Sequence, residues 1–169
     1  MKRLARWILQ ATALLLPALA IYAWQTRDLL PAGERVAAPD FRLPALSGGT
    51  VGLDALRGRT TVLYFFAPWC GVCAASSPQL RWFDRWSGDS VQVVLVALDY
   101  ASPAEVADYA QRHELTMPVL LGDDRTARDY RIRGFPTYYV LDPDGRVAGR
   151  DFGLSTAPGL WWRTLGLSP

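Results

Sequence analysis

The chain contains two cysteines, Cys70 and Cys73, with only two residues between them. They come just after residues 60–66, an unbroken β-branched and aromatic run that is typical of a strand buried on both faces. The pattern becomes helical from Cys70, so this cysteine is expected at a helix N-terminus, where unpaired N–H groups and about half a positive charge favour thiolate over thiol. Because thiolate attacks disulfides, the spacing predicts a redox pair, with Cys70 as the more exposed nucleophile and Cys73 as the buried resolving thiol.

Two neighbouring cysteines also have uses other than disulfide exchange. A structural zinc site needs four ligands, and the chain adds only one histidine, His113, in a predicted surface helix, so we expect no metal site of this kind. Copper(I) accepts two thiolates, so a copper(I)-binding carrier is the alternative function. A disulfide without turnover would close too short a loop to stabilise the fold much. The chain has no Gly-rich dinucleotide loop, and we expect no organic cofactor.

A second group of interest is Gly134-Phe135-Pro136-Thr137, in which a proline opens a predicted strand. We expect the Phe135–Pro136 bond to be cis and to face the cysteines, which would leave the backbone of Phe135 free to pair with an extended substrate. Trp69 directly precedes Cys70 and is expected to shield its flank. The other tryptophans of the two helical segments are interpreted as packing residues: Trp82, Trp86, Trp161 and Trp162.

The elements that position these residues can be read from the sequence pattern. Residues 91–99 form a second apolar run, and Ser102-Pro103 with Glu105 is a helix start. Pro143-Asp144-Gly145 marks the turn of a closing hairpin. The predicted strands are 60–66, 91–99, 117–122, 137–142 and 146–152, and the predicted helices begin at Cys70 and cover 102–114, 123–132 and 156–166. Strands that alternate with helices and end in a hairpin predict an α/β sandwich with one mixed sheet between helices.

The N-terminus carries three cations, and residues 7–24 that follow are free of charge. As a helix these residues would rise roughly 27 Å, close to the ~30 Å hydrocarbon core of a bilayer. Their flanking charges predict a cytoplasmic N-terminus and a domain outside the membrane. A signal peptide cleaved after Ala18-Leu19-Ala20 is the competing interpretation. We therefore expect an anchor over residues 1–26, a polar tether over 27–35 and one domain over 36–169.

The charge of the chain argues against a nucleic-acid-binding protein. The formal net charge is +2, but the part after residue 24 holds 15 basic and 16 acidic residues. No basic face of the size that nucleic acids require is expected from this balance.

The chain resembles thioredoxin-fold proteins, and most of all the membrane-anchored TlpA/ResA-like thiol-disulfide oxidoreductases of the bacterial cell envelope. The resemblance rests on residues 38–73, which include Trp-Cys-x-x-Cys, on 117–123, and on 132–147 with Pro136. It implies a thioredoxin-like α/β sandwich, with a central mixed sheet flanked by helices, an N-terminal β-hairpin extension and a preceding transmembrane anchor helix.

The same resemblance implies a function in the periplasm, on the outer side of the cytoplasmic membrane. There the pair would exchange disulfides with cysteine-containing envelope proteins, and a membrane electron-transfer or oxidising partner would recharge it. Cytochrome c maturation and copper or oxidative-stress defence are the roles implied.

Three positions of the chain depart from relatives of this kind. Many relatives carry Glu three residues after the second cysteine, where this chain has Ser76. Thioredoxin has a buried Asp six residues before the first cysteine, where this chain has Tyr64, whose phenol is a poor proton acceptor at neutral pH. Gly71-Val72 lacks the proline of strongly reducing thioredoxins. A peroxidase is disfavoured, because such enzymes carry Thr or Ser where Ala67 stands.

Overall fold

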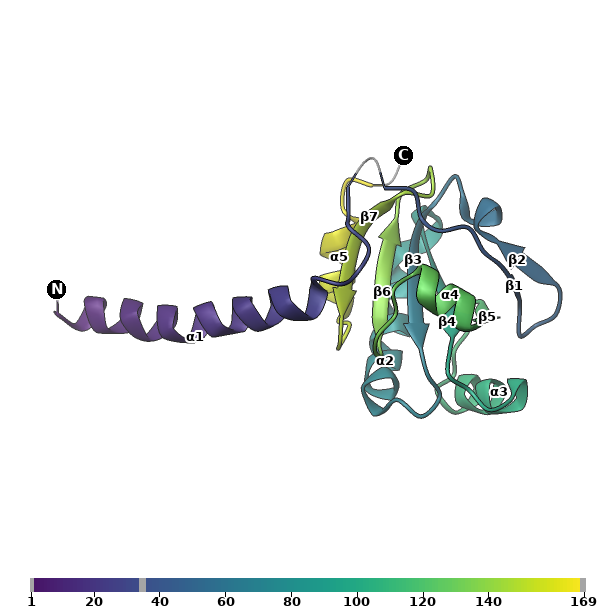
Figure 1. The fold of residues 1–169 in the computed structure, drawn as a ribbon, viewed down its shortest axis with the longest axis horizontal. Coiled ribbons are helices and arrows are strands. Elements are labelled where there is room, and N and C mark those ends of the chain that lie inside the picture. The colour runs from purple at the N-terminus through teal and green to yellow at the C-terminus, as the bar shows by residue number, and fades with distance from the viewer. Residues whose placement is uncertain (1, 34–35, 168–169) are drawn as a thin grey trace.

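The computed structural model describes residues 2–33 and 36–167. Its main sheet has five strands in the order β5-β4-β3-β6-β7, seen from one side in Figure 1. The three strands β3, β4 and β5 run parallel, and β6 and β7 continue the sheet in antiparallel pairs. The strands of this sheet are β3 (Thr60–Phe66), β4 (Val91–Ala97), β5 (Val119–Leu121), β6 (Thr137–Leu141) and β7 (Val147–Phe152). This is the mixed α/β sheet predicted from the order of the elements.

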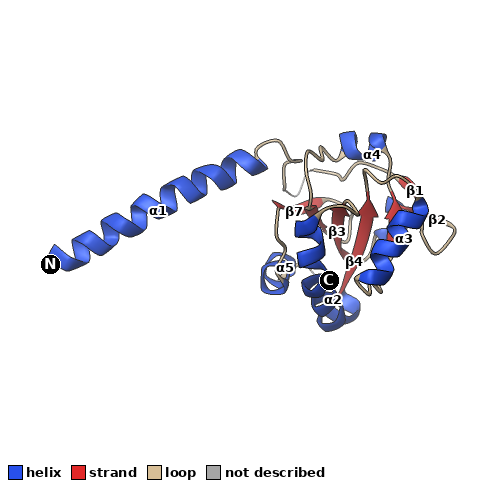
Figure 2. Cartoon of the chain, turned by 90° about the horizontal axis from the view of Figure 1, so that it is seen from below, coloured by secondary structure: helices blue, strands red, loops and turns tan. Residues whose placement is uncertain are grey.

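Helices lie on both faces of the sheet, as Figure 2 shows. Side chains on one face of β3 and β4 pack with α2 (Gly71–Ser87), α3 (Pro103–Arg112) and α5 (Ala157–Thr164). The opposite face packs with the region of α4 (Asp124–Asp129), the short helix η1 (Leu53–Leu56) and the N-terminal segment of the domain. Every residue of β3 is buried, which agrees with a strand covered on both faces.

A two-stranded hairpin precedes the main sheet, as predicted. Its strands β1 (Arg42–Pro44) and β2 (Thr50–Gly52) pair antiparallel across the turn at Gly48 and Gly49, whose positive φ angles suit glycine. Ala45 then bridges to Leu120, so the hairpin is attached to β5. A second short helix, η2 (Gly88–Ser90), links α2 to β4.

The segment after the first helix, which the sequence predicts as a polar tether over residues 27–35, packs against the domain. Leu29 and Leu30 are buried among the side chains of the second core. Arg150 of β7 donates hydrogen bonds to both of their carbonyl oxygens, at 3.0 and 2.6 Å. Arg133 forms an ion pair with Asp28 at 2.8 Å. These contacts fix the end of α1 (Lys2–Thr26) to the domain, from which the helix extends in Figure 1. Residues 34 and 35 of the predicted tether lie outside the described residues.

Helix α1 is long and exposes large apolar side chains, including Trp7 and Trp24. Among the residues that the structure describes, no helix combines the length and the hydropathy of a membrane-crossing segment.

The interpretation of four tryptophans as packing residues is wrong. Trp82 and Trp86 on α2 and Trp161 and Trp162 on α5 are 53–75% exposed. Helices α2 and α5 contact each other beside the sheet and turn Leu80, Phe83 and Leu160 inward, so the positions on their outer faces are left to the tryptophans. An apolar period alone therefore identified the helices but not which of their aromatic residues are buried.

Candidate active site

Cys70 and Cys73 form a disulfide at the start of α2, with their Cα atoms 5.2 Å apart. Cys70 is the N-cap residue, and its Sγ accepts a hydrogen bond from the backbone N–H of Cys73 at 3.1 Å. Buried strand β3 ends four residues earlier and delivers the chain to this point. The predicted position at a helix N-terminus is confirmed, and so is the order of exposure: Cys70 is 6% exposed and Cys73 is fully buried.

The Phe135–Pro136 peptide bond is cis, as predicted. Within the described part of the chain, no hydrogen bond reaches the backbone N–H or C=O of Phe135, while the C=O of Pro136 already accepts from Gly153 N at 2.8 Å. The Phe135 ring meets the ring of Trp69 edge-on, with centroids 5.7 Å apart. The structure thus brings Trp69, the residue before Cys70, next to Phe135, the residue before Pro136.

Trp69 is 62% exposed, yet it is held in place. Its indole Nε1 donates a hydrogen bond to the carbonyl oxygen of Asp99 at 3.0 Å. Asp99 follows the end of β4 and has a positive φ of 50°. The hydrogen bond therefore attaches Trp69 to the loop after β4.

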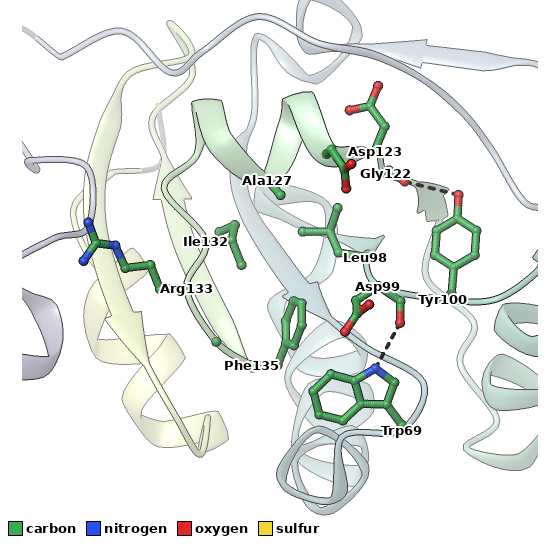
Figure 3. A pocket seen from close by; sticks show the side chains of 12 residues that line it. Trp69, Leu98, Asp99, Tyr100, Gly122, Asp123, Ala127, Ile132, Arg133 and Phe135 are labelled. Atoms are coloured by element: carbon green, nitrogen blue, oxygen red, sulfur yellow. Dashed lines mark hydrogen bonds between the residues drawn. The ribbon is translucent and has the colours of Figure 1, made fainter.

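A cavity of about 770 Å³ opens beside Trp69 and Phe135 (Figure 3). Its walls come from loops at the carboxyl ends of β4 and β5 and from the loop before β6, a common place for ligands in α/β sheets. Tyr100 donates a hydrogen bond to the carbonyl of Gly122 at 3.2 Å and so joins the two strand-end loops. A Cβ at Gly122 would lie 2.6 Å from Leu98 and 2.9 Å from the Ala97 carbonyl, so glycine allows this close approach.

The region behind Cys73 contains the hydroxyl groups of Tyr64 and Ser76. Tyr64 is buried in the same core cluster as Cys73. Burial raises the pKa of Tyr64 far above its ordinary value, and nearby Ser76 opposes only part of the rise. The Tyr64 hydroxyl has no hydrogen-bond partner among the described residues. Ser76 donates to the Val72 carbonyl at 3.0 Å and accepts from Ser155 N at 3.3 Å. Neither group supplies a base at neutral pH.

The described residues contain no cluster of three or more His, Cys, Asp or Glu side chains that could hold a metal ion. His113 lies at the C-terminal end of α3, where its ring packs against Tyr109 at 4.4 Å between centroids. The structure therefore does not bring the histidine together with the two sulfur atoms.

Comparison with known proteins agrees with this geometry. The sequence pattern described as the AhpC/TSA family matches residues 35–150. The chain belongs to this family. Within it, the chain is 32% identical to the thioredoxin-like protein YneN of Bacillus subtilis over 125 residues, which are 73% of this chain and 74% of that protein.

One further relative is named for redox chemistry, and a solved structure shares the fold. The thiol-disulfide oxidoreductase ResA of Oceanobacillus iheyensis is 32% identical over 66% of this chain and 60% of its own length. The crystal structure of StoA from Bacillus subtilis superimposes with a TM-score of 0.66 and 27% identity, covering 76% of this chain and 98% of StoA. With the disulfide at the start of α2, these likenesses identify this family member as a thiol-disulfide oxidoreductase of thioredoxin fold.

Five residues of the cavity wall are not among the site residues predicted from the sequence: Leu98, Asp99, Tyr100, Gly122 and Asp123. A signal for them was present, because each group lies at or just after the carboxyl end of a predicted strand, and the carboxyl ends of parallel strands meet at one edge of the sheet. The hydrogen bond from Trp69 to Asp99 joins residues 30 positions apart and has no sequence signature.

Proposed function

We propose that this oxidoreductase exchanges disulfides with cysteine-containing proteins outside the cytoplasmic membrane, using Cys70 as the attacking sulfur. The observation that carries the proposal is the hydrogen bond from Cys73 N to Cys70 Sγ at the N-terminus of α2. After reduction of the disulfide, this N–H and the helix dipole stabilise a negative charge on the same sulfur. Cys73, fully buried, has no comparable exposure to a partner protein.

The exchange proceeds in two steps that conserve atoms and electrons. Cys70 thiolate attacks one sulfur of a substrate disulfide and forms a mixed disulfide, while the other substrate sulfur leaves as thiolate and takes up a proton. Cys73 then loses its proton and attacks Cys70 Sγ, which closes the enzyme disulfide and releases the substrate as a dithiol. The same steps run in reverse when the oxidised pair accepts two electrons from a dithiol.

Phe135, Pro136 and Trp69 hold the partner in this proposal. The unpaired backbone N–H and C=O of Phe135 suit an extended substrate segment, which would add hydrogen bonds as a strand does. Trp69 and Phe135 together give the segment an apolar rim. No organic cofactor is required for exchange between thiols and disulfides.

The proposed location is the bacterial cytoplasmic membrane, with α1 as a single anchor and the domain in the periplasm or outside the cell. Support comes from the uncharged residues 7–24 and from the exposed Trp7 and Trp24, although Gln10 and Thr12 make the helix less apolar than a typical span. A membrane electron-transfer or oxidising protein would then recharge the pair. Cytochrome c maturation and copper or oxidative-stress defence are the candidate roles, as for the envelope proteins that the chain resembles.

Paired cysteine variants test the proposal. Cys73→Ala is expected to trap a protein or peptide disulfide as a covalent adduct on Cys70, visible by non-reducing electrophoresis and mass spectrometry. Cys70→Ala is the matched control, because it keeps one cysteine but not the attacking sulfur, and it should form no adduct and show no turnover. Failure of Cys73→Ala to form an adduct, where the wild type turns over, would contradict the assignment. Stoichiometric copper(I) binding without exchange would favour the carrier function instead.

A further inference from the structure

The cavity beside Trp69 carries an excess of negative charge. Asp99, Asp123 and Asp124 contribute carboxylates to its lining, and all three residues are exposed. Asp123 accepts hydrogen bonds from the backbone N–H and the hydroxyl of Thr126 at 2.8 and 2.7 Å, and these bonds lower the pKa of its carboxyl. Among the described residues of the lining, Arg133 is the only cation, and it already forms an ion pair with Asp28.

Apolar and aromatic groups surround these carboxylates. Trp69 and Phe135 form one side of the cavity, and Leu98 is buried below them. In Figure 3, Asp99 lies close to Trp69, and Asp123 lies on the other side of Leu98. A ligand in this cavity would therefore contact the rings of Trp69 and Phe135 near the active site and the aspartate carboxylates farther from it.

Hydrogen bonds between the wall segments connect the sides of the cavity to one another. Trp69 donates a hydrogen bond to the Asp99 carbonyl, and Tyr100 donates one to the Gly122 carbonyl. Glycine at position 122 allows the loop after β5 to approach the end of β4 closely. Binding into such a site orders few protein groups, so little affinity is lost to conformational entropy.

We infer that the cavity is a specificity subsite for a cationic side chain, lysine or arginine, that lies within a few residues of the substrate cysteine. This inference rests on the proposed function and adds the class of substrate to it. The apolar stem of such a side chain can cover Trp69 and Phe135 while its charged end reaches the carboxylates. A cation over the indole face gains a further attraction, which is strongest for tryptophan among the aromatic residues.

Charge complementarity of this kind acts mainly on the rate of productive encounter and weakens in salt. We expect reduced enzyme to exchange with a lysine-flanked peptide disulfide about tenfold faster than with the same peptide carrying glutamate, at low ionic strength. A glutamine peptide should fall between the two. In 1 M salt, where the screening length is about 3 Å, the three rates should converge.

The experiment measures second-order rate constants for the full-length protein, reduced beforehand, with three peptides that differ only at the residue next to the cysteine. The test variant carries Asp99→Asn and Asp124→Asn, which remove two charges with little change in shape. Asp123 is left intact because it caps α4. Asp89→Asn is the control for position, since it removes one charge of the same kind at the opposite end of β4, in η2.

The ratio of the rate constant for the lysine peptide to that for the glutamate peptide should drop to within about twofold in the double variant and stay near tenfold in the control. Equal rates for all three peptides with the wild type would overturn the cationic subsite and leave the proposed function intact. A ratio that survives in the double variant would also overturn it. If no peptide is exchanged by the reduced enzyme, the proposed function itself fails and the subsite fails with it.

Discussion

The ring of Trp69 packs edge-on against the ring of Phe135, with centroids 5.7 Å apart. This contact joins the segment that carries Cys70 to the loop that carries Pro136. Both segments belong to the site where a substrate cysteine has to be placed against one sulfur atom. The pairing of β3 with β6 brings the two segments together, the two rings meet between them, and the hydrogen bond from Trp69 to the Asp99 carbonyl holds the indole.

We predict that Trp69→Ala lowers kcat/KM for protein or peptide disulfides by about tenfold, mainly by raising KM, since it removes the aromatic rim but neither cysteine. Trp69→Phe is the matched control: it keeps a ring near Phe135 and loses only the hydrogen bond to Asp99, so its loss should be smaller. Steady-state kinetics with one peptide disulfide measures both. An unchanged KM in Trp69→Ala would contradict a role of the rim in binding.

The ion pair between Arg163 of α5 and Asp151 of β7 is expected to contribute to stability. The side chains are only 29% and 14% exposed, and Asp151 also accepts a hydrogen bond from Tyr138 at 3.1 Å. Burial raises the pKa of Tyr138, and the Asp151 carboxylate raises it further, so the phenol remains a donor. Arg163→Leu leaves this carboxylate without its cation and should lower the free energy of unfolding by about 2 kcal/mol.

A surface ion pair offers the control for this change. Arg125 and Asp129 are 80% and 41% exposed at their side chains and lie one helical turn apart. Arg125→Leu should alter the free energy of unfolding by less than about 0.5 kcal/mol. Urea denaturation of the two variants compares them directly, and equal effects would show that the partial burial of the Asp151 pair is unimportant.

We predict that His113 makes stability depend on pH in a defined direction. Its pKa lies below the ordinary value of 6.5 because burial disfavours the charged ring, and Arg112 and Arg81 add repulsion. The unfolded chain therefore binds this proton more readily than the folded chain. The stability that neutral His113 contributes is fully present above pH 6.5, the ordinary pKa. It is lost as the pH falls below 6.5 toward the lower pKa of the folded state.

The measurement compares the denaturation midpoint of the wild type and His113→Gln between pH 7.5 and 5. The wild type should lose stability more steeply over this range than the variant, because His113 is the only histidine. Parallel profiles would contradict the assignment.

Tyr64→Phe is expected to leave the free energy of unfolding unchanged or slightly raised, because it removes a buried hydroxyl that has no hydrogen-bond partner in the described structure. The pH profile of exchange should also stay unchanged, since burial keeps this phenol protonated. Tyr109→Phe is the contrasting variant. Its hydroxyl lies 3.2 Å from Ser77 Oγ, so its removal should cost about 1 kcal/mol. A shift of the profile in Tyr64→Phe would show that this residue does take part in proton transfer.

Elements could be predicted from the sequence where the pattern that determines them lies within a few neighbouring residues. The apolar run of β3 and the helix start at Ser102 lie within a few residues of chain, and the structure confirms both, with Ser102 Oγ accepting from Glu105 N at 3.3 Å. The position of Cys70 at a helix N-terminus is of the same kind, because a buried strand followed by a helical pattern determines it.

The features that the sequence did not reveal depend on neighbours far along the chain. Trp86 follows the apolar period of α2, but it is exposed because no element of the described structure covers that face of the helix. Leu29 stands in a polar segment and is buried because the domain supplies Arg150 and an apolar surface. The carboxylates of the cavity come from two loops that only the parallel pairing of β4 and β5 brings together.

The attachment of residues 45 and 46 to β5 has a consequence for the risk of aggregation. A strand with unpaired N–H and C=O groups at the border of a sheet can recruit a strand from another molecule and start aggregation. Here Leu46 N donates a hydrogen bond to the Val119 carbonyl at 2.8 Å. At the opposite border, Gly33 N donates to the Val147 carbonyl, and Val147 N donates to the Val36 carbonyl. In the described structure the chain itself therefore occupies backbone groups at both borders of the sheet, which leaves fewer unpaired groups there to recruit a strand from another molecule.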